Sequence, residues 1–194
     1  DPVRVITNHS SGKMGYALAE AGRDRGAKVI LVAAPTGLPD PALVEVVAVK
    51  TAQEMCDAVL ERVKGADALI MAAAVADYRP TTEADQKIKK ASADLTIDLA
   101  KTTDILEAAT GDFVKVGFSA ETQNLVSNAK IKVGSKNLDL IVANDVTDPD
   151  SGFGIDTNKV TLIDRDLNVE ELPVLTKYEV GHRILDRVSK LLGS

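Results

Sequence analysis

The stretch Ala66-Asp-Ala-Leu-Ile-Met-Ala-Ala-Ala-Val75 is the most apolar run of the chain and carries a single charged side chain. Its apolar residues do not alternate with polar ones, which is typical of a strand buried on both faces of a parallel sheet. A capping box, Thr51-Ala-Gln-Glu54, opens a helix shortly before it. Strands that alternate with helices form parallel sheets covered on both faces, so we expect this run near the centre of such a sheet.

The same alternation extends in both directions from this run. Before it, we expect strands over residues 3–7, 27–34 and 44–49, and a helix over 12–25. After it, we expect strands over 113–118 and 139–143, a helix over 122–136, a hairpin from 159–163 and 169–175, and a final helix over 176–192. The expected fold is a single α/β domain over residues 1–194, with a three-layer, Rossmann-like, mostly parallel sheet, helices on both faces and a β-hairpin appendage.

The composition excludes several classes of protein. The 194 residues carry a formal net charge of −6 and only 3% aromatic side chains, which argues against a nucleic-acid partner. Cys56 is the single cysteine, and with His9 and His182 it offers too few ligands for a Cys/His metal site. No apolar run is long enough for a membrane span, so we expect a cytoplasmic protein with no membrane partner.

The connection Thr7-Asn-His-Ser-Ser-Gly-Lys-Met-Gly15 joins the first expected strand to the first expected helix. Backbone N–H groups of small residues at a helix N-terminus favour a phosphate, and Ser10, Ser11 and Lys13 add hydroxyl donors and a positive charge. The two glycines of this loop fit neither a Walker A loop nor the G-x-G-x-x-G motif. The alternative is a capped helix whose glycines allow close packing.

Asp77 follows the apolar run, in Ala72-Ala-Ala-Val-Ala-Asp77-Tyr78. Ligands of open α/β sheets bind beyond the carboxyl ends of the strands, so this carboxylate is a candidate to hold a metal ion, a ribose or a base. The alternative is an Asx-turn that closes the strand.

Two groups of lysines are candidates to contact a polyphosphate. Lys87-Ile-Lys-Lys90 lies in a long polar segment, residues 76–94, which predicts either a solvated turn or a mobile flap over a ligand. Lys132 and Lys136 are four residues apart and share one face of an expected helix. Phe118, at the end of an expected strand, is a candidate to stack on a base or, alternatively, to fill the core.

Taken in order, these motifs resemble a known family. The strings that carry the resemblance are Asp1-Pro-Val-Arg4, Asn8-His-Ser-Ser-Gly-Lys-Met-Gly15, Ala73-Ala-Val-Ala-Asp-Tyr78, Lys87-Ile-Lys-Lys90, Gly117-Phe118 with Glu121-Thr122, and Lys136-Asn-Leu-Asp139 with Ala143-Asn-Asp145. Together they are similar, over nearly the whole chain, to bacterial phosphopantothenate–cysteine ligase, also called phosphopantothenoylcysteine synthetase. That family carries one more strand and a Gly/Thr-containing turn ahead of the first string. In bacteria this domain usually follows a decarboxylase domain on one polypeptide, so the resemblance implies a domain cut from a longer bifunctional chain.

The resemblance implies a ligase that makes a coenzyme A precursor in two steps. The carboxylate of 4′-phosphopantothenate attacks the α-phosphate of CTP, with Mg²⁺ (or Mn²⁺) present, and pyrophosphate leaves. The amine of L-cysteine then displaces CMP. By position, Lys87 matches the flap lysine that stabilises charge on the α-phosphate, and Asn8 matches the asparagine that holds the oxyanion of the second step.

The other site residues are also carried over by position. Nucleotide contacts are expected from the apolar run, from the turn before a short helix, and from one aromatic and two lysine side chains: Met71, Ala72, Ala73, Asp77, Thr103, Asp104, Ile105, Leu106, Phe118, Lys132 and Lys136. Contacts to phosphate or substrate are expected from Ser10, Ser11, Gly12, Lys13 and Ala74. Asp77 is the candidate metal ligand, beside the phosphates of CTP.

The resemblance also implies partners. A homodimer is expected, with the hairpin region as a contact and the sites near the subunit boundary. A phosphopantothenoylcysteine decarboxylase domain is expected on the same polypeptide, and FMN would belong to that domain only. Two other functions fit the same layers: an NAD(P)-dependent Rossmann oxidoreductase, which the missing G-x-G-x-x-G motif disfavours, and a non-catalytic module that binds a phosphorylated metabolite.

Overall fold

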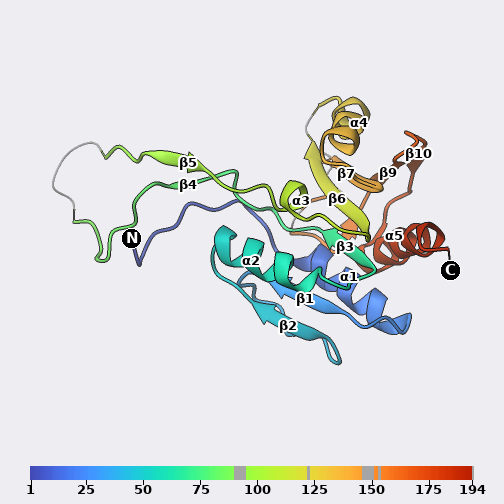
Figure 1. The fold of residues 1–194 in the computed structure, drawn as a ribbon, viewed down its shortest axis with the longest axis horizontal. Helices are drawn as coiled ribbons and strands as arrows, with labels where there is room; N and C mark the ends of the chain where they lie inside the picture. The colour runs from blue at the N-terminus through green and yellow to red at the C-terminus, as the bar shows by residue number, and fades with distance from the viewer. Residues whose placement is uncertain (90–94, 122, 146–150, 153, 194) are drawn as a thin grey trace.

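The structure is a computed structural model that describes residues 1–89, 95–121, 123–145, 151–152 and 154–193. Lys90, Thr122 and residues 147–150 of the Asp- and Gly-rich loop lie outside these ranges. A five-stranded sheet in the order β10-β9-β7-β6-β3 forms the centre (Figure 1). Its strands are β3 (Ala68–Met71), β6 (Val114–Glu121), β7 (Leu140–Asp145), β9 (Val160–Asp164) and β10 (Val169–Glu171).

The strand directions confirm the expected α/β class. β3, β6 and β7 run parallel, whereas β9 is antiparallel to β7 and β10 is antiparallel to β9. The predicted hairpin is therefore the continuation of the central sheet at one edge. Beside it, the short strands β8 (Thr157–Asn158) and β11 (Leu175–Thr176) pair with each other.

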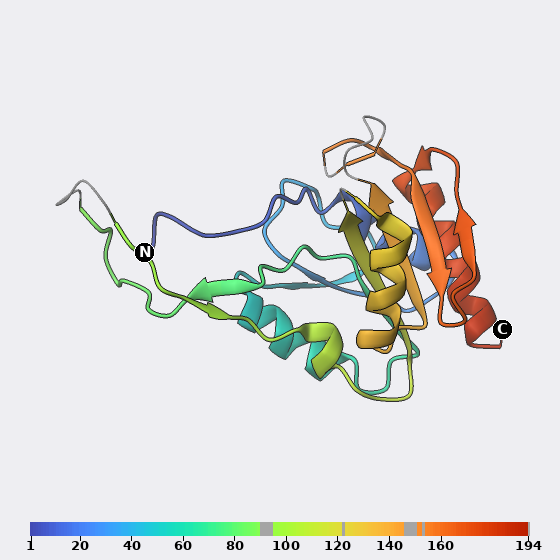
Figure 2. The same ribbon diagram turned by 90° about the horizontal axis from the view of Figure 1, so that it is seen from above.

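Helices cover both faces of this sheet (Figure 2). On one face, Val116 and Val142 of the strands pack with Val180 and Ile184 in a core that involves α1 (Lys13–Asp24) and α5 (Lys177–Leu191). On the other, Ile141 packs with residues of α3 (Ile105–Ala108) and α4 (Leu125–Ser135). Successive strand residues are thus buried on opposite faces, which explains the unbroken apolar runs of the sequence.

A second, two-stranded parallel sheet is formed by β1 (Ile30–Ala33) and β2 (Glu45–Ala48). It packs with α2 (Ala52–Arg62) in a core that contains the buried Cys56. The predicted capping box is confirmed, because Thr51 Oγ1 accepts a hydrogen bond from Glu54 N at 3.1 Å and the Glu54 carboxylate accepts from Thr51 N.

The predicted position of the run Ala66–Val75 near the centre of the sheet is wrong. Within the described residues, β3 is the end strand of the five-stranded order, and no strand pairing joins it to β1. Both faces of β3 are partly covered: Ile70 packs toward the core of α1 and α5, and Leu69 packs toward the cores of α2 and α4. Apolar contacts on both faces therefore do not require a central position.

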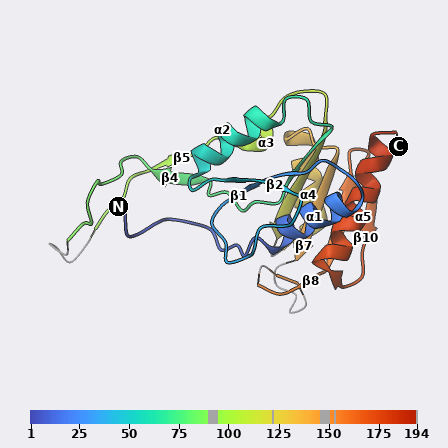
Figure 3. The ribbon, with the colours of Figure 1, turned by 90° about the horizontal axis from the view of Figure 1, so that it is seen from below.

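The predicted strand over residues 3–7 is also wrong. These residues are exposed and pair with no strand, and the N–H groups of Val3 and Arg4 bind the carboxylate of Asp1 instead. They run beside an arm that projects from the body of the protein in all three views (Figures 1–3). Near its base, the arm is formed by the antiparallel strands β4 (Tyr78–Pro80) and β5 (Leu99–Lys101).

None of the helices in the described part of the chain is long and apolar enough to cross a membrane.

Candidate phosphate- and nucleotide-binding site

A pocket of about 70 Å³ opens where α1 begins, at the carboxyl ends of the parallel strands. Its lining comes from the start of α1, the ends of β3, β6 and β7, the segment after β7 and the first residue of α5: Ser10, Ser11, Gly12, Lys13, Met14, Gly15, Ala72, Phe118, Ser119, Ala120, Asn144, Gly152, Asn158 and Lys177. This is the edge at which open α/β sheets bind their ligands. The structure thus brings the predicted residues Ser10–Lys13, Ala72 and Phe118 together.

The N-terminus of α1 faces this pocket without a side-chain cap. The N-cap residue, Gly12, has a left-handed backbone with a φ of 76°, and no side chain caps the helix. The hydroxyl of Ser10 accepts from Gly12 N, and that of Ser11 accepts from Lys13 N, both at a long 3.4 Å. Hydrogen bonds of this length are weak, so a phosphate can compete for these donors.

The left-handed backbone of Gly12 makes a stability prediction. A Cβ at this position would lie 2.6 Å from Thr36 Cγ2, in a backbone conformation that disfavours side chains. We expect Gly12→Ala to lower the free energy of unfolding by about 2 kcal/mol or more, measured by urea denaturation. Gly15→Ala is the matched control, because its Cβ would meet nothing within 4 Å and it lies inside α1. We expect that control to gain up to about 1 kcal/mol, and equal losses in both variants would contradict the prediction.

Lys13 is held by the segment that follows β7. Its Nζ donates to the carbonyl of Gly154 at 2.8 Å and to Asp156 Oδ1 at 2.7 Å. This hydrogen bond and the charge of Lys13 hold the pKa of the exposed Asp156 carboxyl below its ordinary value. A ligand phosphate would therefore compete with a carboxylate for the ammonium group of Lys13.

Lys177 belongs to the same pocket and was missed by the sequence reasoning. It is the first residue of α5 and is only 5% exposed. The signal that was available is a lysine at the start of a helix, where the helix dipole disfavours a positive charge. Asn144 and Asn158 were also missed as lining residues, and both contact the hydroxyl of the buried Ser151.

The predicted lysines of α4 reach the same edge of the sheet. Lys132 Nζ donates to Ser119 Oγ at 2.7 Å, and Ser119 is a lining residue of the pocket. Lys136 forms an ion pair with Asp104 at 2.7 Å. Partial burial raises the pKa of Asp104, but the hydrogen bonds from Lys136 and from the backbone N–H groups of Glu107 and Leu106 outweigh this and lower it.

Several predicted nucleotide contacts are core side chains. Ile105 and Leu106 are 2% and 7% exposed, and Met71 packs against the cores of α2 and α4. Any contact from Ile105 or Leu106 to a ligand would therefore be made by the backbone of this turn. Phe118 packs against the core of α1 and α5 and also lines the pocket, and its stacking on a base stays a prediction.

Asn8 lies close to the segment that follows β3. Its Nδ2 donates to the carbonyl of Val75 at 3.2 Å. The predicted residues Ala73, Asp77 and Thr103 are exposed around this segment, whereas Ala74 is half-buried. Among the described residues, no group of three or more His, Cys, Asp or Glu side chains could hold a metal ion. Asp77 alone fits Mg²⁺ only where substrate phosphates supply most of the ligands.

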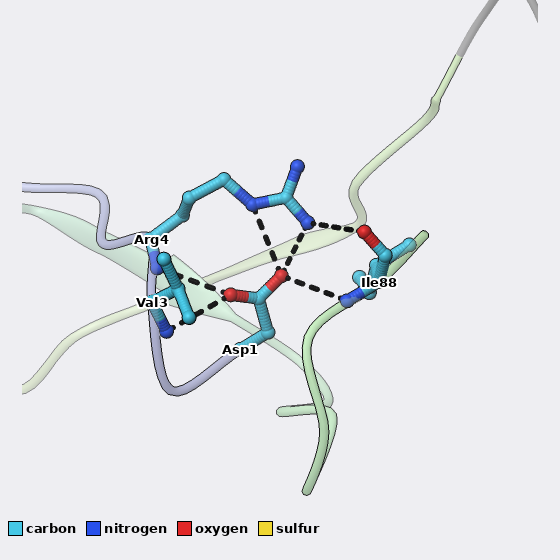
Figure 4. A network of polar contacts seen from close by, with 4 residues as sticks. All are labelled: Asp1, Val3, Arg4 and Ile88. Atoms are coloured by element: carbon cyan, nitrogen blue, oxygen red, sulfur yellow. Dashed lines mark hydrogen bonds and ion pairs between the residues drawn. The ribbon is translucent and has the colours of Figure 1, made fainter. Parts of the chain in front are cut away.

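Lys87 is not brought to the pocket. It is exposed and precedes Ile88, whose backbone is tied to the N-terminal residues (Figure 4). Asp1 Oδ2 accepts from Ile88 N at 3.2 Å, and Arg4 NH2 donates to the carbonyl of Ile88 at 3.1 Å. The chain N-terminus lies at the arm, away from α1 and α5 (Figure 1). Within one chain, the two predicted catalytic residues Asn8 and Lys87 are therefore apart.

A larger cavity, of about 470 Å³, lies at the opposite end of the strands. It is lined by the end of α2, the start of β3 and the segment from α3 to β6, including Leu60, Val63 and Phe113. None of the predicted site residues is part of this lining.

The fold and this pocket define the class of the protein: an open, mainly parallel α/β sheet with a pocket at a helix N-terminus beside the carboxyl ends of the strands. The chain belongs to the family of the DNA/pantothenate metabolism flavoprotein C-terminal domain, whose model matches residues 1–192. The resemblance found in the motifs is thereby confirmed.

Named relatives agree with this family. The chain is 46% identical to the coenzyme A biosynthesis bifunctional protein CoaBC of Bacillus subtilis (strain 168), covering 98% of this chain and 48% of the relative. It is 47% identical to the CoaBC protein of Escherichia coli (strain K12), covering 97% and 48%. A crystal structure of a CoaBC C-terminal domain matches with a TM-score of 0.84 at 41% identity, over 100% of this chain and 89% of that one. The chain thus spans about half the length of these curated relatives.

Proposed function

We propose that the chain is a cytoplasmic phosphopantothenate–cysteine ligase that uses CTP. The observation that carries this proposal is the similarity, over 97–98% of the chain, to coenzyme A biosynthesis bifunctional proteins. The bifunctional names and the double length of these relatives support a phosphopantothenoylcysteine decarboxylase, with its FMN, as the covalent partner domain. The pocket at the start of α1 supports a phosphorylated substrate.

In the first step, a carboxylate oxygen of 4′-phosphopantothenate attacks the α-phosphorus of CTP. A new P–O bond forms, and the bond between the α-phosphorus and the oxygen that bridges to the β-phosphate breaks. Pyrophosphate leaves, and the product is an acyl cytidylate. Lys132 of α4 and Lys136, the residue that ends this helix, can pair with the β- and γ-phosphates once their present partners Ser119 and Asp104 are exchanged. Lys87 stabilises the charge that develops on the α-phosphate when the arm reaches the site.

In the second step, the amine of L-cysteine attacks the acyl carbon. An N–C bond forms, the C–O bond to CMP breaks, and the proton lost by the amine passes to solvent, so that the product is a neutral amide. The tetrahedral intermediate carries an oxyanion, which the side-chain amide of Asn8 can stabilise as a hydrogen-bond donor. The backbone segment Ala72–Val75 beside Asn8 would hold the acyl cytidylate.

Mg²⁺ (or Mn²⁺) would be held by the phosphates of CTP together with Asp77. When bound, the ion would neutralise charge on the phosphates and so favour the departure of pyrophosphate. Asp77 offers one exposed carboxylate at the end of the apolar run, which suits a cation that takes one protein ligand and several phosphate oxygens.

The proposed enzyme is a homodimer, and the arm supports this assembly. Ile97, Leu99 and Tyr78 of the arm are 50%, 47% and 55% exposed, and Val5 beside it is 82% exposed. An isolated two-stranded hairpin is marginally stable in water, and clustered exposed apolar side chains mark interaction surfaces. A second copy of the chain that covers this arm would bury these side chains. It would also supply a second Lys87, which could act at the site of the first copy.

We expect Ile97→Asp to convert the dimer to monomers at micromolar concentration, because the interface would then bury a charge without a partner. The measurement is the molar mass from light scattering after gel filtration. Leu192→Asp is the control, since Leu192 is 46% exposed but lies at the end of α5, outside both the arm and the hairpin expected as a contact. A wild-type chain that elutes as a monomer would refute the homodimer.

The experiment for the ligase mixes the protein with CTP, Mg²⁺ and 4′-phosphopantothenate and follows pyrophosphate with and without L-cysteine. We expect about one pyrophosphate per site without cysteine and continuous release with it, accompanied by CMP. Nucleotide binding without any pyrophosphate would favour a non-catalytic binding module. A change in NAD(P)H fluorescence on mixing, without CTP turnover, would favour an oxidoreductase.

A further inference from the structure

Lys177 lines the pocket, and the two proposed reaction steps give it no role. Its side chain is buried, with 5% exposure, although it begins a helix whose dipole disfavours a cation. Its Nζ donates to three backbone carbonyls: Gly152 at 2.8 Å, Thr157 at 3.4 Å, and Ile155. An ammonium group has three N–H donors, so these carbonyls can use all of them.

Lys177 and Lys13 hold the same piece of backbone. We call residues 152 and 154–157 the clamp segment. Lys177 binds its carbonyls from α5, while Lys13 Nζ binds the carbonyl of Gly154 at 2.8 Å and Asp156 at 2.7 Å from α1. Burial and then the charge of Lys13 lower the pKa of Lys177, whereas Asp156 acts in the opposite direction. The two ammonium groups therefore repel each other, and both bind the clamp segment.

The two helices that carry these lysines are fixed against each other. α1 and α5 lie side by side (Figure 3), and a Cβ at Gly181 would lie 3.2 Å from Ala21 Cβ and 3.4 Å from the carbonyl of Ala17. Such close packing allows little relative movement. Lys177 thus ties the clamp segment to a rigid frame that also carries the N-terminus of α1.

We propose that Lys177 is a positioning residue for the phosphate group that binds at the start of α1, because it fixes the clamp segment that holds the ammonium group of Lys13. The inference rests on the proposed function, in which a ligand phosphate occupies this pocket. The side chain of Asp156 is 86% exposed, so its carboxylate can be displaced by the phosphate, while the carbonyl of Gly154 keeps Lys13 in place. Without Lys177, the long side chain of Lys13 would have to be ordered by the ligand itself.

The test measures dissociation constants by calorimetry for 4′-phosphopantothenate and for CTP, each titrated separately. We expect Lys177→Met to weaken one of the two ligands by about 10-fold or more and the other by about 2-fold or less, which also tells which phosphate lies at α1. Lys190→Met is the matched control, because Lys190 is an exposed lysine of the same helix. Equal dissociation constants for Lys177→Met and the control, with both ligands, would overturn the inference.

A double-variant cycle separates positioning from a general loss of structure. If Lys177 acts through Lys13, the Lys13→Met/Lys177→Met double variant binds no more weakly than Lys13→Met alone. Fully additive losses would overturn the inference. Should Lys177→Met fail to fold, judged by circular dichroism, Lys177→Gln takes the place of Lys177→Met in the cycle, because its side-chain amide can still donate to the carbonyls of the clamp segment. If the variants show this dependence of ligand binding on Lys177, but the wild-type protein releases no pyrophosphate, the inference is supported and the ligase is refuted.

Discussion

The Lys87→Gln variant is expected to release pyrophosphate about 10³-fold more slowly than the wild type, or not at all. Glutamine has a similar length but no charge to offset the negative charge that develops on the α-phosphate. Lys87 is exposed on the arm and is not part of the pocket lining, so CTP binds largely without it. The loss should therefore appear in kcat, with little change in the KM for CTP.

The control for this variant is Lys89→Gln, which removes the same charge two residues further along the arm. We expect it to keep pyrophosphate release within about 3-fold of the wild type, because a charge that is merely nearby is screened by solvent. Pyrophosphate release that survives in Lys87→Gln would remove Lys87 from the reaction. Equal losses in both variants would assign the effect to the net charge of the arm.

Local features of the fold were predictable where neighbouring residues decide them. Thr51 and Glu54 are three residues apart and cap each other, so the start of α2 can be read directly from the sequence. Strand pairing depends on residues far apart in the chain, which is why the end position of β3 was missed. The strand predicted over residues 3–7 failed because the Asp1 carboxylate takes the N–H groups of Val3 and Arg4.

The site was predictable where one connection supplies its residues. The loop Ser10–Lys13 reads as an anion site because its donors are adjacent in sequence and precede a helix. Lys177 could not be found in this way, since only the packing of α5 against α1 brings it to the pocket. The separation of Lys87 from Asn8 could not be predicted from the sequence either, because it follows from the pairing of β4 with β5 in a projecting arm.

The second large effect is expected for Asn8→Asp, which should still release about one pyrophosphate per site but form the amide about 10²- to 10³-fold more slowly. Aspartate is nearly isosteric with asparagine, so the first step retains its geometry. A carboxylate, however, has no N–H to donate to the oxyanion, and its negative charge opposes the one that develops there. It would also face the carbonyl of Val75, to which the Asn8 amide now donates at 3.2 Å.

The measurement follows pyrophosphate and CMP in the same reaction and looks for the acyl cytidylate by mass spectrometry after quenching. Asn128→Asp is the matched control, because the Nδ2 of Asn128 also donates to a backbone carbonyl, that of Gln123 at 3.1 Å, but outside the pocket. We expect normal CMP release from the control and accumulated acyl cytidylate only in Asn8→Asp. Parallel losses of pyrophosphate and CMP in Asn8→Asp would mean that Asn8 binds the substrate in both steps and does not act on the oxyanion. That result would leave the ligase in place and move the oxyanion donor to another group.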